Sequence, residues 1–149
     1  MMKLFKILVS LSFLVSCGIM DPDENQLGGD EGSIHIEYLG QEWTEGGYAP
    51  LFSLVNDSTE TVQYFGYSES YPLFSAEALS DTGWTNLMWG WCGTGASFYA
   101  LEPDSSIQFL GMSPSYSCTW RLVLDITEMD SLSSRRLRSE NIIYTIPQN

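Results

Sequence analysis

The chain has 149 residues, and 19 acidic residues against six lysines and arginines give it a formal net charge of −13. A charge of this sign argues against nucleic acid as a partner, because no basic surface could release counterions from phosphates. The length fits one domain with a tail and leaves no room for a second hydrophobic core.

Residues 1–16 have the pattern of an export signal. Lys3 and Lys6 form a positively charged start, and the apolar run Ile7–Val15 that follows is too short to span a bilayer. Ser16 is the small residue expected before a cleavage site. We therefore interpret this segment as a signal peptide that is removed from the mature protein.

The motif Leu14-Val15-Ser16-Cys17 closes this segment. It resembles the lipobox of bacterial lipoproteins. The resemblance implies that the signal is cut before Cys17, that the Cys17 sulfur carries diacylglycerol, and that the new amine is acylated. It also implies a lipid-anchored protein of the cell envelope, and Gly18 after the cysteine is compatible with the outer membrane. The alternative is an ordinary secretory signal with a chance cysteine.

Residues 17–33 are expected to be a lipidated cysteine followed by a flexible acidic tether. Gly18–Ser33 contains five carboxylates and four glycines but almost nothing apolar to bury. Calcium binding is the alternative reading of these carboxylates, yet the segment has no glycine-centred twelve-residue loop that ends in glutamate. We therefore expect no metal here.

Residues 34–149 are predicted to form one all-β domain, because short β-rich runs alternate with turn residues as in an antiparallel β-sandwich or barrel. Proline in the turn at Glu102–Ser105 fixes φ without costing a ladder hydrogen bond. About eight strands are expected: Ile34–Leu39, Leu51–Val55, Thr61–Tyr67, Trp84–Trp91, Ser97–Leu101, Ser105–Gly111, Cys118–Ile126 and Asn141–Ile146, with Pro72–Phe74 as a short edge piece.

One short helical connection is expected over Glu128–Arg138, between the last two strands. Asp130 lies near its start and three arginines lie near its end, which would complement the helix dipole. Arg121, by contrast, should point outward from its strand and pair with a carboxylate on a neighbouring strand.

Cys92 and Cys118 remain as an even pair once Cys17 is assigned to the lipid, in a chain exported to an oxidising space. We expect a disulfide between them, which would stabilise the fold by about 3 to 4 kcal/mol on the chain-entropy model. Two free thiols or a metal-binding pair are the alternatives. The chain has no CxxC spacing, and its single histidine, His35, is far away in the sequence.

Alternate residues of the strand from Cys118 to Ile126 are apolar, so the cysteine and Trp120 should line the core together. A buried tryptophan near a disulfide resembles the immunoglobulin-like sandwich, although the usual order of cysteine, tryptophan, cysteine is not kept. The resemblance implies an architecture and no function.

Trp89 and Trp91 are the first candidate binding residues, because both should lie on the sheet face opposite Cys92. Exposed indoles there could stack on sugar rings or anchor a protein partner. The alternative is that both pack in the core.

Arg135, Arg136 and Arg138 are the second candidate, as a basic cluster that could grip a carboxylate or phosphate on a partner. The alternative for this cluster is salt bridges within the molecule.

Catalysis is not expected, because general acid–base chemistry near neutral pH usually relies on histidine and His35 should face solvent. The chain has no GxSxG or HExxH motif and no glycine-rich phosphate loop. We expect no cofactor and no metal. The leading hypothesis is an envelope lipoprotein whose sandwich binds glycan or protein. The alternatives are a structural or assembly accessory of an envelope complex and, third, a secreted hydrolase.

Overall fold

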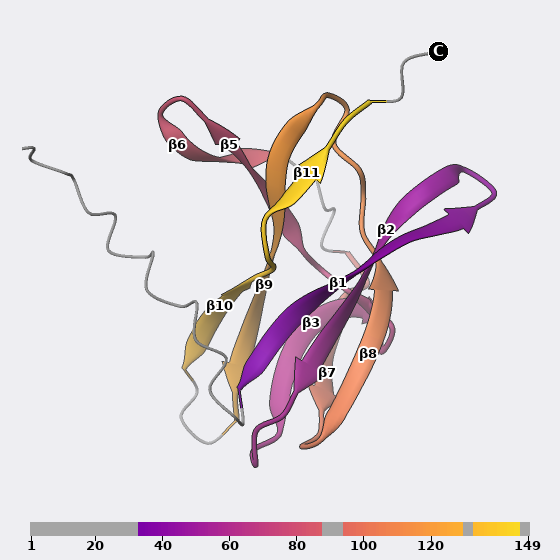
Figure 1. The fold of residues 1–149 in the computed structure, drawn as a ribbon. Helices are drawn as coiled ribbons and strands as arrows, with labels where there is room; N and C mark the ends of the chain where they lie inside the picture. Colours follow the sequence, from indigo (N-terminus) through magenta and orange to yellow (C-terminus); the bar gives the residue numbers. More distant parts are fainter. Residues whose placement is uncertain (1–32, 88–93, 130–132, 147–149) are drawn as a thin grey trace, which may run out of the picture.

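The computed structural model describes residues 33–87, 94–129 and 133–146. This part of the chain is all-β, with antiparallel pairing throughout and a sandwich-like arrangement (Figure 1). The strands are β1 (Ile34–Thr44), β2 (Gly47–Asn56), β3 (Val62–Ser68), β4 (Tyr71–Pro72), β5 (Ser75–Ser80), β6 (Gly83–Leu87), β7 (Ser97–Leu101), β8 (Ser105–Leu110), β9 (Cys118–Glu128), β10 (Ser134–Arg138) and β11 (Ile142–Tyr144). No helix in these residues could cross a bilayer.

Strand β9 is the centre of the larger, eight-stranded sheet. It pairs with β3 and β5 along one edge and with β10 and β11 along the other. Strand β7 continues the sheet beyond β3, and β6 continues it beyond β5. The smaller sheet has three strands in the order β1–β2–β8.

The core lies between the inner faces of these two sheets. From β9, the alternate residues Trp120, Leu122, Leu124 and Ile126 are all buried, which confirms the period-two pattern expected from the sequence. From the smaller sheet, Phe52 meets the Trp120 ring edge to face with the centroids 6.0 Å apart. Burial of these large apolar side chains is the main driving force for joining the sheets.

The helix predicted over Glu128–Arg138 is wrong. Glu128 is the last residue of β9, and Ser134–Arg138 is the strand β10, which pairs antiparallel with β9. The hydrogen bond from the Glu128 amide to the Ser133 carbonyl, 3.0 Å long, closes the hairpin. A helix here would have had few apolar residues to anchor it, whereas the strand satisfies its backbone on an open edge of β9 and buries Leu137.

Candidate functional site

A two-stranded β-arm projects from the smaller sheet. Strand β8 accompanies β2 from Asn56 only as far as Leu51, and a last bond from the Gly111 amide reaches the Pro50 carbonyl at 2.7 Å. Beyond this point β1 and β2 continue alone to their turn. We call residues 41–49 the β-arm, which stands away from the molecule at the upper right of Figure 1.

The turn of the β-arm is fixed locally. The Thr44 hydroxyl donates to the Gly47 carbonyl at 2.7 Å and accepts from the Gly46 amide at 3.2 Å. Gly47 has φ of +109°, a conformation that favours glycine over any residue with a Cβ. The hairpin therefore has a defined end, although no third strand supports it.

Trp43 and Tyr48 face each other across the β-arm. Their rings meet edge to face with centroids 5.1 Å apart, and the two residues are 67% and 66% exposed. Both lie on the same face of the hairpin as the buried Phe52 but beyond the end of the core. An exposed pair of large aromatic side chains on a hydrogen-bonded hairpin is typical of a binding site, because its apolar area is still available to be buried.

The charge of the β-arm is negative. Glu42 and Glu45 flank the aromatic pair, and the segment from Gln41 to Pro50 contains no lysine or arginine. A partner that covers Trp43 and Tyr48 would therefore meet an acidic rim.

Trp89, Trp91 and Cys92 lie outside the described residues, as does Cys17, so their predicted roles stay predictions. Cys118 is a half-buried free thiol in the structure. Burial raises the pKa of the Cys118 thiol. Because Cys92 is not described, the disulfide stays a prediction.

Arg136 and Arg138 lie on one face of β10 and Arg135 lies on the other, and the three contact different groups. Arg136 forms a forked pair with Asp125, with nitrogen–oxygen distances of 2.9 and 3.2 Å, and this hydrogen bond raises the pKa of the guanidinium. Arg138 Nε lies 3.6 Å from Glu77, and Arg135 reaches the Ile34 carbonyl at 3.4 Å. Two of the three thus make the intramolecular salt bridges that the sequence left as the alternative.

Arg121 pairs with Glu77 of the neighbouring strand β5, as expected, at 2.8 Å. Its guanidinium also lies 3.9 Å from the centre of the Trp84 ring on β6. Arg121 and Arg138 thus share the carboxylate of Glu77 in an ion-pair network on the outer face of the larger sheet.

His35 faces outward from β1, with its side chain 37% exposed. Its Nε2 lies 3.3 Å from Glu37 Oε1, and its Nδ1 lies 3.9 Å from Asp57 Oδ2. His35 is not among the residues that line the two grooves beside β1, one next to Glu140 and the other next to Arg135. Among the described residues, no three histidine, cysteine or carboxylate side chains are grouped so that they could hold a metal ion.

No protein-family model matches the chain, and a search of curated proteins finds no significant match. The candidate site therefore depends on the structure alone.

Reasoning from the sequence missed the β-arm. The expected strands stopped at Leu39 and resumed at Leu51, which left the aromatic pair in a connection. The signal was present: Trp43 and Tyr48 lie symmetrically about Glu45–Gly46, the spacing of cross-strand neighbours in a tight hairpin.

Proposed function

We propose that this chain is a lipid-anchored protein of the bacterial cell envelope, and that its β-sandwich is a non-catalytic module that binds a protein partner through the β-arm. The export signal, the lipobox-like motif ending at Cys17 and the acidic tether support the anchoring. The exposed Trp43–Tyr48 pair supports the binding role and is the observation that carries the proposal.

The angle between the two rings favours protein over glycan. Their planes lie 75° apart, so the pair presents one face and one edge and forms no flat platform for successive sugar rings. Side chains of this kind act as anchors in protein interfaces when they enter an apolar pocket. With Glu42 and Glu45 beside them, the matching surface is an apolar pocket with a basic rim.

The β-arm lies at the end of β1 remote from the tether. Strand β1 begins at Ile34, next to the tether, and runs 11 residues to Thr44. At a rise of about 3.3 Å per residue, the nine residue steps from Ile34 to Trp43 carry the aromatic pair roughly 30 Å from the point where the tether enters the domain. The lipid and the binding element would then act at opposite ends of β1.

Substitution of Trp43 and Tyr48 by alanine tests this proposal. The affinity-tagged protein is extracted from native membranes in mild detergent, and co-purifying proteins are quantified by mass spectrometry. We expect one neighbour near equal stoichiometry, and each alanine variant should weaken its binding by about 30-fold or more, as for truncation of an interface anchor.

Phe98→Ala is the matched control, because Phe98 is 60% exposed but lies on β7 of the other sheet. This variant should retain the partner at the wild-type level. Equal recovery of the partner by Trp43→Ala, Tyr48→Ala and Phe98→Ala would refute the role of the β-arm. A glycan receptor would instead show tryptophan quenching by a sugar and no stoichiometric protein neighbour.

A further inference from the structure

Strand β1 has an open edge. The alternation of hydrogen-bonded and non-hydrogen-bonded pairs with β2 shows which backbone groups of β1 face this edge. The Asp57 amide donates to the Ser33 carbonyl at 3.3 Å, so these two residues form a hydrogen-bonded pair. Because such pairs alternate along an antiparallel ladder, His35 and Glu37 bond to β2. The N–H and C=O groups of Ile36 and Tyr38 therefore point away from β2, toward the open edge.

Leu39 is an extra residue between the pairs Tyr38–Phe52 and Gly40–Leu51, so beyond this bulge the outward positions shift from even-numbered to odd-numbered residues. The two-residue turn Glu45–Gly46 closes on a hydrogen-bonded pair, Thr44 with Gly47. Because hydrogen-bonded pairs alternate from Thr44 backward, Trp43 and Gln41 are in non-hydrogen-bonded pairs, and their backbone groups face outward from β1. The open edge thus runs from Ile36 to Thr44 and ends beside the aromatic pair.

The start of this edge already accepts a donor from elsewhere in the molecule. The Ile34 carbonyl, which shares the outward phase, accepts a hydrogen bond from Arg135 on β10 at 3.4 Å. Among the described residues, no strand pairs with β1 on this side beyond that point. The arginine occupies the position that a donor on a neighbouring strand would take.

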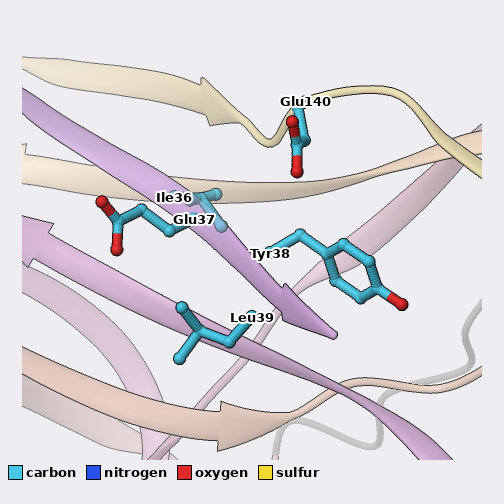
Figure 2. A pocket seen from close by; sticks show the side chains of 5 residues that line it. All are labelled: Ile36, Glu37, Tyr38, Leu39 and Glu140. Atoms are coloured by element: carbon cyan, nitrogen blue, oxygen red, sulfur yellow. The ribbon is translucent and has the colours of Figure 1, made fainter. Parts of the chain in front are cut away.

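Next along the edge lies a groove, seen in Figure 2. It is lined by Ile36, Glu37, Tyr38 and Leu39 from β1 and by Glu140, whose side chain extends from the β10–β11 connection toward β1. Burial, and then the nearby charge of Glu140, raise the pKa of Tyr38. The charged side chains that line the groove are both carboxylates, so it would attract a basic segment and repel an acidic one.

The other edge of the hairpin is protected. On β2, where β8 ends, the chain has Pro50, which has no N–H to offer an added strand. From Ile36 to Thr44 on β1 there is no proline. Natural proteins block exposed edges with proline, charge or bulges. β2 has the proline, whereas β1 has the bulge at Leu39 and the carboxylates of Glu37 and Glu42, which would repel an acidic strand but attract a basic one.

We propose that the open edge of β1, from Ile36 to Thr44, binds an extended, lysine- or arginine-rich segment of the partner protein by strand addition. The added strand bonds to the outward backbone groups of Ile36, Tyr38, Gln41 and Trp43, and its basic side chains lie near Glu37 and Glu140. The inference rests on the proposed protein-binding function and names the chemistry of the bound segment. In a second copy of this chain the one arginine-rich segment, Ser134–Arg138, is already the strand β10 paired with β9.

The probe is a capped peptide of alternating valine and lysine, as long as Ile36–Thr44, titrated into the 15N-labelled protein. We expect amide exchange at Tyr38, Gln41 and Trp43 to slow by about tenfold or more at saturation, because each amide gains a hydrogen bond. Amides of the inward residues His35 and Glu37 are already bonded and should change less. The same peptide with glutamate in place of lysine should bind at least tenfold more weakly.

Gln41→Pro and Gln41→Ala separate the backbone from the side chain. Proline deletes the outward N–H, so it should weaken peptide binding by about tenfold. Alanine keeps the N–H, so it should change binding less than twofold. Unchanged exchange at the outward amides of the wild-type protein, equal binding of the glutamate peptide, or peptide-independent dimerisation in sedimentation would each overturn strand addition, whether or not the proline variant folds.

The two proposals fail in different ways. If Trp43→Ala loses the native partner but the outward amides stay unprotected with the peptide, the β-arm still binds protein and strand addition is wrong. If the peptide protects those amides but the alanine variants of Trp43 and Tyr48 recover as much of the native partner as the wild type, the proposed role of the aromatic pair is wrong.

Discussion

Replacing Asn56 with alanine is expected to lower the free energy of unfolding by about 3 kcal/mol, because one buried side chain joins two loops of the sandwich. Asn56 is the last residue of β2 and is fully buried. Its Nδ2 donates to the carbonyls of Glu60, Leu101 and Glu102 at 2.8, 3.0 and 3.2 Å.

The amide oxygen of Asn56 completes the network. It accepts from the Ser58 amide at 3.1 Å and from the Ser58 hydroxyl at 2.6 Å. Alanine would remove these bonds at once. The Glu60 and Glu102 carbonyls keep the hydroxyls of Ser58 and Ser105 as donors, but the Leu101 carbonyl loses its side-chain donor and the Ser58 amide loses its acceptor, at a cost of about 1 to 3 kcal/mol for each group that no water reaches.

Urea unfolding followed by tryptophan fluorescence measures the effect. Asn86→Ala is the control, since Asn86 is exposed on β6, and it should change the free energy of unfolding by less than about 0.5 kcal/mol. A loss below about 1 kcal/mol for Asn56→Ala would contradict the structural role assigned to this side chain.

Cys17→Ala is expected to abolish incorporation of a fatty-acid analogue and to release the protein from the membrane. Residues 17–149 carry 19 carboxylates and four arginines, so they have little electrostatic attraction for anionic headgroups. Attachment would then depend on acyl chains, and because each buried methylene contributes about 0.8 kcal/mol, two or more chains give lasting attachment where one is marginal.

Metabolic labelling with an alkyne fatty acid, followed by membrane fractionation, makes the measurement. Cys118→Ala is the matched control and should keep full labelling, because its thiol belongs to the folded domain. Undiminished labelling of Cys17→Ala would contradict the lipoprotein assignment and remove the anchor from the proposed function.

Features that depend on local alternation could be predicted from the sequence. The buried face of β9, the inward Ile34 and Ile36, and the Arg121–Glu77 pair follow from a period of two and from charge pairing across neighbouring strands. The all-β sandwich followed from the same alternation and from the spacing of turns.

Features that depend on where a neighbouring strand ends could not be predicted. Trp43 is exposed because β8 ends before it reaches the β-arm, and the residues near Trp43 in the sequence do not indicate where β8 ends. Ser134–Arg138 was predicted as part of a helix because its charges suit a helix end, but its backbone forms antiparallel pairs with the open edge of β9 instead. In both cases tertiary context overrides the local pattern.

The proposed function requires that the β-arm contacts a protein partner in the cell, and site-specific photocrosslinking measures this contact. A photoreactive residue replaces Glu45 at the turn of the β-arm or, as a control, Asp81 at the exposed turn between β5 and β6. We predict one crosslinked product from position 45, none from position 81, and loss of the product when Trp43→Ala is added. Equal crosslinking from both turns, or a product at position 45 that survives Trp43→Ala, would contradict it.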